Sequence, residues 1–316
     1  YILRLNSSVI CATVFENGGT DSMSSAVSND RIKHLFLWPA FLLVLLITLF
    51  PLIYALVVSF QTVRLVPPTP ARFVGFDNYA EIIQSVRFWG SVQVTAVIVF
   101  ASVALQFILG YALALALHHN VPGATLYRVT FLLPMFLAPV CVALIARMFF
   151  HPVLGPVNDL FTALGYENIP FLTNSTLAIT TLIVVEVWQW TPFVILLMLA
   201  GLQGLPSEVF EAARVDNISA WRRFRDLTFP MLLPLSIAVI FIRLIEGFKI
   251  IDTVFVLTGG GPGTSTETLT LFAYNEGFKK FNIGMTSALS FVFLIVVIVF
   301  GTLYLAAAQR LTKRYR

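Results

Sequence analysis

Six ionisable side chains stand inside long apolar segments of this sequence, where charges are rare. They are Arg147, Glu186, Arg243, Glu246, Lys249 and Asp252. Two interpretations are open. Residues three apart share a helix face, so Arg243 with Glu246, and Lys249 with Asp252, can pair locally. Alternatively, some of these charges line a polar pathway, because charges inside apolar segments usually face a cavity or a partner.

No catalytic or metal-binding pattern accompanies these charges. The four histidines lack metal-ligand spacing, and the two cysteines indicate neither a disulfide framework nor a metal site. The nucleotide-binding pattern G-x-x-x-x-G-K-[ST] is absent. The run "GGGPG" (259–263) is the one glycine-rich candidate for phosphate binding, and it lacks the following Lys-Ser/Thr. We interpret it as a flexible loop and expect that this chain is not an enzyme.

Composition indicates the environment of the segments that carry these charges. Apolar residues make up 58% of the 316 positions and charged residues only 11%, and the mean hydropathy is +0.87. A soluble domain has nearer a quarter of its residues charged. Water would be a poor solvent for so much apolar surface, so the chain is predicted to be an integral membrane protein.

The apolar segments are long enough to be membrane-spanning helices, which need about 20 residues each. Six segments qualify, at about 35–60, 89–117, 129–150, 176–202, 232–257 and 283–308. The expected fold class is an all-α integral membrane protein with six transmembrane helices. Prolines in several of these segments predict either packing adjustments or bends that open a cavity. Gly110 and Ala114, four apart, suit close helix contact.

The distribution of Lys and Arg predicts the orientation of these helices. With a cytoplasmic N-terminus, eleven basic residues lie inside: Arg31, Lys33, Arg128, Arg214, Arg222, Arg223, Arg225, Arg310, Lys313, Arg314 and Arg316. Five lie outside: Arg64, Arg72, Arg87, Lys279 and Lys280. Both termini are therefore expected in the cytoplasm, and the net charge of +4 is attributed to topology, with no nucleic-acid partner.

Three regions follow from these boundaries. Residues 1–34 form a cytoplasmic tail, of which 1–22 are interpreted as a non-native extension or a disordered tail. Residues 35–308 form the six-helix domain, which includes a cytoplasmic loop at 203–231. Residues 309–316 form a basic cytoplasmic tail.

The loop between the fourth and fifth helices contains "SEVFEAARVDNISAWRRFRDLTFP" (207–230), which has eight charged side chains in 24 residues. It reads as two short helices. Ser207 can cap the first, and Asn217 stands at a turn, because Asn tolerates the left-handed conformation. Ser219 can cap the second. Two interpretations remain open from the residues alone: docking into a cleft of a cytoplasmic partner, or an amphipathic loop resting on lipid headgroups.

A family resemblance decides between them. The stretch "EAARVDNISAWRRFRDLTFPMLLP" (211–234) resembles the EAA loop of binding-protein-dependent ABC importer permeases. "WTPFVILLMLAGLQGLP" before it and "DTVFVLTGGGPGTSTETLTLFAY" after it resemble the carbohydrate-uptake branch, in particular its maltose-permease-like first subunit. The resemblance covers about residues 31–316. It implies the type I ABC importer permease fold, with a cytoplasmic coupling helix that docks into a separate ATP-hydrolysing subunit.

The resemblance carries over to individual positions of the loop. The residues expected to couple to the ATPase are Glu211, Ala212, Ala213, Asp216, Asn217 and Trp221. Asn217 replaces the usual Gly of the family, and Phe229 replaces the common Leu before Pro230. Because Asn also adopts positive φ, we expect the turn to persist at some cost.

The resemblance also implies that the fourth and fifth spans contribute to a sugar site. Sugars have apolar ring faces and polar rims, so such a site needs aromatic platforms beside hydrogen-bonding groups. The candidate substrate-binding residues are Glu186, Trp188, Gln189, Trp190, Glu246, Phe248 and Lys249. Trp188 and Trp190 point about 200° apart on a helix, so one of them is expected to face the cavity.

The implied assembly contains a second homologous permease, two ATPase subunits and a periplasmic or lipid-anchored sugar-binding protein, in a bacterial or archaeal plasma membrane. No cofactor is expected on this chain, since ATP and Mg²⁺ are used by the partner ATPase. An ABC permease for a non-sugar solute such as glycerol phosphate is the nearer alternative. A proton-coupled secondary carrier that relays protons through Glu186 and the charges of the fifth span is the more distant one.

Overall fold

The computed structural model describes residues 21–118 and 123–314. The chain divides into two compact units, and the boundary between them in the sequence lies between Val57 and Val58. The described secondary structure is helical, apart from the two-residue strands β1 (Gln61–Thr62) and β2 (Arg72–Phe73). These strands pair in antiparallel register. The prediction of an all-α membrane protein is confirmed.

The first unit consists of most of helix α1 (Asp21–Ser59), whose stretch Leu37–Ser59 has a mean hydropathy of 2.9. The helix begins well before position 35, where the first span was predicted to start. Residues 1–20 lie outside the described residues, so the expected nature of 1–22 stays a prediction.

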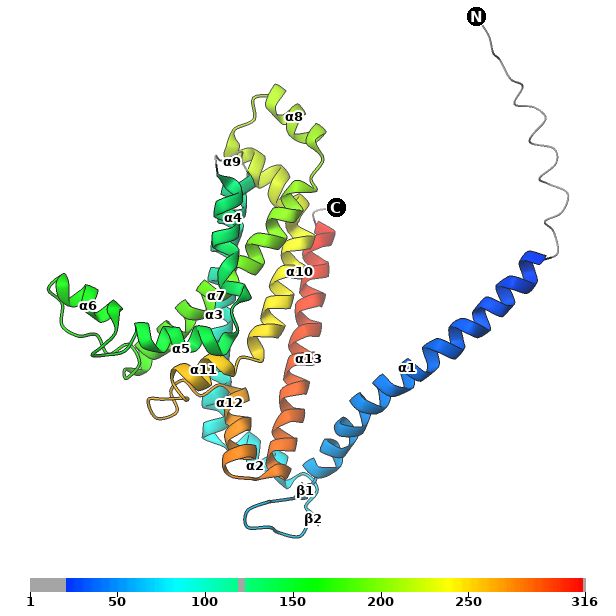
Figure 1. Ribbon diagram of the computed structural model, residues 1–316, viewed down its shortest axis with the longest axis vertical. Coiled ribbons are helices and arrows are strands. Elements are labelled where there is room, and N and C mark those ends of the chain that lie inside the picture. The colour runs from blue at the N-terminus through cyan, green and yellow to red at the C-terminus, as the bar shows by residue number, and fades with distance from the viewer. Residues whose placement is uncertain (1–20, 119–122, 315–316) are drawn as a thin grey trace, which may run out of the picture. The chain divides into compact units, whose positions relative to one another are not determined.

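Four long helices of the second unit run beside one another in Figure 1. They are α3 (Val86–His118), α7 (Ser175–Gln203), α10 (Phe229–Phe248) and α13 (Ile283–Arg314). All four belong to helical stretches that are long and apolar enough to cross a membrane. Helix α13 continues through most of the predicted tail at 309–316 instead of ending at 308.

Helices α3 and α7 approach each other closely at Gly110. A Cβ built on Gly110 would lie 2.6 Å from Val194 Cβ, which no real Cβ contact tolerates. Ala114, one turn further along α3, is fully buried in the same apolar cluster as Val194 and Met198. The predicted role of Gly110 and Ala114 in close helix contact is confirmed, because only small residues let two backbones come this near.

The third predicted span, 129–150, is not one straight helix. It consists of α4 (Ala124–Leu132), the 3₁₀ turn η1 (Leu133–Phe136) and α5 (Pro139–Phe149). The two arms are bent by 97° at the break before Pro139. Proline cannot donate a main-chain hydrogen bond and its ring obstructs the preceding turn, which explains the position of the bend.

The fifth predicted span, 232–257, is likewise interrupted. Helix α10 ends at Phe248, and a short helix α11 (Asp252–Leu257) follows after a break. Thr268 Oγ1 donates to the carbonyl of Ile250 in this break at 3.2 Å, and Thr270 Oγ1 donates to the same oxygen. Unwound backbone inside a membrane needs partners of this kind, because lipid offers none.

The shorter elements cap the bundle at both ends. Near one end lie α8 (Ser207–Val215), α9 (Ala220–Arg223) and the π-helical turn η2 (Phe224–Thr228), which leads directly into α10. Towards the opposite end lie α2 (Asp77–Gln84), α12 (Leu269–Tyr274) and the π-helical turn η3 (Asn275–Lys279), as Figure 1 shows. Helix α6 (Pro156–Ala163) belongs to the connection between α5 and α7.

The predicted number of spans is confirmed in a modified form. The described residues contain five helical stretches that are long and apolar enough to cross a membrane. The two helical arms joined by the bend before Pro139 make a sixth span if they are taken together as one span. Two of the six expected helices are thus broken within the bundle. Polar side chains form hydrogen bonds at both breaks.

Candidate functional site

A buried amide joins three helices of the bundle. Gln106 of α3 is fully buried, and its Oε1 accepts a hydrogen bond from Arg243 Nε of α10 at 3.0 Å. Its Nε2 donates to the main-chain oxygen of Glu186 in α7 at 3.1 Å. Arg243 and Glu186 are themselves only 3% and 5% exposed. The amide therefore satisfies a buried cation and a backbone carbonyl with one side chain, which apolar surroundings demand.

An aromatic ring and the same cation form a stacked pair. The guanidinium carbon of Arg243 lies 4.5 Å from the ring centroid of Trp190. A cation over an indole face is attracted by the ring quadrupole, and more strongly where water is excluded. The pair places a half-buried aromatic surface directly beside hydrogen-bond donors, which is the combination a carbohydrate site needs.

Glu186 connects this cluster to the broken fifth span. Its Oε1 accepts a hydrogen bond from Thr253 Oγ1, in the first turn of α11, at 2.8 Å. Gln189, one turn further along α7, performs a similar function at the other break. Its Nε2 donates to the carbonyl of Leu137, just before α5, at 3.3 Å. Polar side chains of α7 thus form hydrogen bonds with both interrupted spans.

The two tryptophans of α7 occupy different environments, as their spacing predicts. Trp190 is half-buried under Arg243, whereas Trp188 is 49% exposed on a different side of the helix. The structure groups Trp190 with Glu186 and Gln189, and it does not bring Trp188 to them. The substrate-binding role of each ring stays a prediction.

The predicted local ion pairs of the fifth span are not the ones found. Lys249 Nζ pairs with Glu246 Oε1 at 2.8 Å, and both side chains are about half exposed. Arg243 is bound to Gln106 instead of Glu246. Phe248 is buried and packs edge-on against two other rings. Helix α10 ends directly after Phe248, which leaves the Glu246–Lys249 pair at an accessible helix end.

The predicted coupling residues lie at the end of the bundle that carries α8. Glu211, Ala212 and Asp216 are exposed, whereas Ala213 is 4% exposed and faces inwards. A cavity of about 770 Å³ separates α8 from the bundle, and its lining includes Glu211 and Trp221. Helix α8 thus stands apart from the apolar core. Its exposed small and acidic residues are accessible to a partner.

The turn after α8 has the geometry that Asn217 was expected to provide. Asn217 has a φ of +53°, and the N–H of Ile218 donates to the carbonyl of Ala213 at 3.1 Å. This pattern is the usual left-handed end of a helix, with Asn in the place of Gly. Ser219 caps α9 as predicted, since its Oγ accepts from the N–H of Arg222 at 3.4 Å. Ser207 is not a cap, because Pro206 occupies that position.

Two residues of the cluster were not among the sequence candidates. Gln106 could have been found from the sequence, because it is an amide residue in an otherwise apolar stretch of a predicted span. Nothing in the sequence distinguished Thr253, because threonine is common in membrane helices, where its hydroxyl usually donates to a carbonyl of the same helix. Arg243 was recognised as a buried charge, but its stacking on Trp190 depends on the relative rotation of two helices.

Comparisons with known proteins agree on the class of this chain. Residues 88–316 match the family model described as "Binding-protein-dependent transport system inner membrane component". The trehalose transport system permease protein SugA of Mycobacterium tuberculosis is 33% identical over 288 residues, which is 90% of this chain and 92% of SugA. The trehalose/maltose transport system permease protein MalF of Thermococcus litoralis is 32% identical, over 88% of this chain and 94% of MalF.

A further relative and a solved structure extend this result. The probable ABC transporter permease protein y4oQ of Sinorhizobium fredii is 37% identical, over 83% of this chain and 85% of y4oQ. A chain of a bacterial alginate ABC transporter, crystallised with an alginate pentasaccharide-bound periplasmic protein, superposes with a TM-score of 0.81 at 20% identity. It covers 92% of this chain and 98% of that chain, which shows a common fold. The protein belongs to the family of binding-protein-dependent transport system inner membrane components, the permease subunits of ABC transporters.

Proposed function

We propose that this chain conducts a sugar or sugar derivative across the membrane, as one of two permease subunits of an ATP-driven importer. The observation that carries this proposal is the similarity over most of the chain to permeases named for trehalose and maltose transport. The relatives named for multiple sugars in Streptococcus mutans and for sulfoquinovosyl glycerol in Agrobacterium fabrum support the same substrate class.

The polar cluster supports a neutral, hydroxylated solute. Arg243 already engages Gln106 and stacks on Trp190, and Lys249 is paired with Glu246. Neither cation is left free to attract an anion, so glycerol phosphate is a poorer match. Hydroxyl groups both donate and accept, and they suit the mixed donors and acceptors beside the Trp190 ring.

The complete importer would contain a second permease, two ATPase subunits and an extracytoplasmic binding protein, in the plasma membrane of a bacterium or archaeon. ATP would be hydrolysed in the partner subunits, with no cofactor on this chain. Closure of the ATPases would move α8 and rock the bundle between inward-open and outward-open states. Glu211, Ala212, Ala213, Asp216, Asn217 and Trp221 would transmit this movement. Both termini would then be cytoplasmic.

Transport by the assembled complex tests the proposal. This chain is reconstituted in proteoliposomes with its partner permease, its ATPase subunits and its binding protein, and uptake of radiolabelled trehalose and maltose is measured. We expect uptake that requires ATP and the binding protein and that vanadate blocks.

Other outcomes would contradict specific parts of the proposal. Uptake that follows a proton gradient and ignores vanadate would indicate a secondary carrier. ATP-dependent uptake of glycerol phosphate, with no uptake of any sugar offered, would keep the importer and refute the substrate class. A complex without an ATPase subunit under mild detergent would refute the importer itself.

A further inference from the structure

A tight ion cluster lies near the end of the bundle opposite α8. Arg87, in the first turn of α3, donates to both carboxylate oxygens of Glu267 at 2.7 Å. Asn275 Nδ2 donates to the same carboxylate at 2.7 Å, and Glu267 is only 2% exposed. A bidentate Arg–carboxylate pair of this kind holds both groups in one orientation. The cluster therefore joins α3, the segment before α12 and η3 rigidly.

The acids of this cluster are buried and its cations are not. Glu276 is 6% exposed and pairs with Lys280, whose side chain is 54% exposed. The side chain of Arg87 is 35% exposed. Lys279 is exposed, and within the described part of the chain its side chain forms no ion pair or hydrogen bond. Glu267 and Glu276 neutralise Arg87 and Lys280, so the unpaired positive charge that this cluster presents to solvent is that of Lys279.

These cations surround a cavity of about 260 Å³. Its lining consists of Arg87, Gly259, Gly260, Gly263, Thr264, Glu267, Asn275, Lys279 and Lys280. The cavity is smaller than the roughly 300–1,000 Å³ of sites for drug-sized ligands. It suits a single side chain or a small ion.

Hydrogen bonds within the glycine loop connect the residues of one wall, and the flexibility expected from the sequence stays a prediction. The hydroxyls of Thr258 and Thr266 are hydrogen-bonded at 2.8 Å, and Thr266 Oγ1 donates to the carbonyl of Gly261 at 2.9 Å. Gly260 and Gly263 have φ of +93° and +62°, which side chains rarely adopt. The glycines of this wall carry no side chains, so a partner can approach the cavity closely there.

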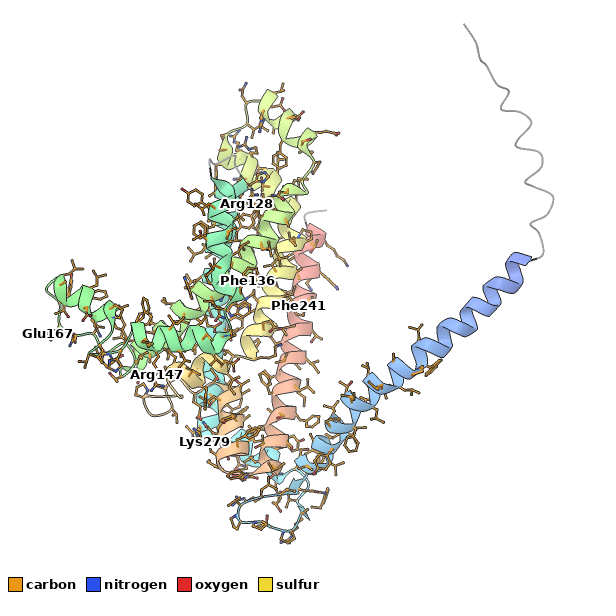
Figure 2. All side chains as sticks on the ribbon, viewed as in Figure 1. Arg128, Phe136, Arg147, Glu167, Phe241 and Lys279 are labelled. Carbon is orange, nitrogen blue, oxygen red and sulfur yellow. The ribbon has the colours of Figure 1, made fainter. Side chains whose placement is uncertain are left out.

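We propose that this cavity receives an Asp or Glu side chain on the docking face of the extracytoplasmic binding protein. The inference rests on the proposed function, which makes the end opposite α8 the outer face. Figure 2 shows Lys279 towards that end and Arg128 near the α9 end. The positive rim attracts an acid, the unpaired Lys279 is available to pair with it, and the preformed walls limit the entropy lost on docking.

The binding step itself tests the proposal. The complete transporter is placed in lipid nanodiscs, and the Kd of its purified, substrate-loaded binding protein is measured for wild type and for Lys279→Glu. We expect Kd to rise about tenfold, because reversal turns attraction into repulsion. The defect should shrink between 0.1 M and 1 M NaCl, over which the Debye length falls from about 10 Å to about 3 Å.

The matched control is Arg72→Glu, which reverses an exposed cation of β2 outside the cavity lining. We expect its Kd to stay within about twofold of wild type. A second arm screens Asp→Lys and Glu→Lys variants of the binding protein against Lys279→Glu. One of them should weaken binding to wild type and restore binding to the variant.

Each alternative result overturns a defined claim. An unchanged Kd in Lys279→Glu, or an equal loss in Arg72→Glu, would refute the cavity as a docking site. Normal binding with impaired uptake of an anionic sugar would identify a site for a small anion instead. If the binding protein neither binds nor stimulates the wild-type transporter, the proposed function itself fails.

Discussion

At the scale of single residues, the buried polar cluster of the bundle is held by hydrogen bonds between helices. Gln106, Glu186 and Arg243 come from three helices and are each at most 5% exposed. Removing one partner from such a set strands the others in apolar surroundings, which costs more than the hydrogen bond contributed. The cluster therefore fixes the relative rotation of α3, α7 and α10.

The two neighbouring tryptophans provide a matched test of the solute site. We expect Trp190→Ala to raise the KM for sugar uptake about tenfold, because it removes an aromatic face on which an apolar sugar ring would stack, and such a contact contributes about 1 kcal/mol. Trp188→Ala should leave KM within about twofold, since Trp188 lies on another side of α7. Uptake kinetics in proteoliposomes measure both. An equal loss in the two variants would place the solute elsewhere.

At the scale of elements, both interrupted spans depend on polar side chains of other segments. Gln189 bonds the carbonyl before α5, and Thr268 and Thr270 bond the carbonyl of Ile250 before α11. Unpaired carbonyls at these depths would each cost several kcal/mol in lipid. The breaks are therefore stable features of the fold, and they place α5 and α11 against each other.

The helix contact at Gly110 can be tested by one methyl group. Gly110→Ala should lower the free energy of unfolding by about 1–3 kcal/mol, because its Cβ would meet Val194 at 2.6 Å. Gly90→Ala, on the same helix with no neighbour within 4 Å, should be neutral or slightly stabilising. Thermal unfolding in detergent compares them. Equal stability of Gly110→Ala and Gly90→Ala would contradict the explanation.

Substitutions in helix α8 should impair transport without impairing insertion into the membrane. Glu211→Lys and Asp216→Lys should abolish uptake and the ATPase stimulation by the binding protein, because they reverse exposed charges at the proposed contact with the ATPase. Both variants should still insert into the membrane. The control Asp226→Lys alters an exposed acid that is not among the predicted coupling residues and is paired with Arg225, and it should retain uptake. Normal transport by both α8 variants would refute the coupling role.

At the scale of the whole molecule, the second unit separates two functional ends. Helix α8 and its turn lie at one end, and the cationic cavity lies towards the other, with the Gln106–Arg243 cluster on the helices between them (Figure 1). An importer driven by ATP on one side and supplied with solute on the other requires this separation. Rigid helices that run the length of the bundle can carry movement from one end to the other.

Cysteine labelling tests the orientation of these ends. In a background with Cys11→Ser and Cys141→Ser, Thr264→Cys and Asp216→Cys each introduce one exposed thiol. A membrane-impermeant maleimide should label Thr264→Cys in intact cells, and Asp216→Cys only after permeabilisation. The positive-inside distribution of Lys and Arg is the reason for this expectation. The reverse pattern would invert the topology and remove the docking proposal.

The sequence by itself determined that the chain lies in a membrane, how many spans to expect and where the turn after α8 lies. Hydropathy depends on residue type alone, and the turn at Asn217 depends on which residues tolerate a positive φ. The sequence also placed candidate charges in the fourth and fifth spans. It did not give the partners of those charges, since Lys249 pairs with Glu246 and Arg243 with Gln106.

Only the tertiary structure decided where the spans break and which polar groups meet. Proline marks a position where a helix can bend, but the 97° bend before Pro139 also needs a donor for the carbonyl of Leu137, which Gln189 supplies from 52 residues further along the chain. The hydrogen bonds of Gln106 and the stacking of Arg243 on Trp190 also depend on tertiary structure, because helix packing determines how α3, α7 and α10 are rotated relative to one another. Local propensity acts over one or two turns of chain, whereas burial of polar groups is satisfied by whichever segment lies adjacent in space.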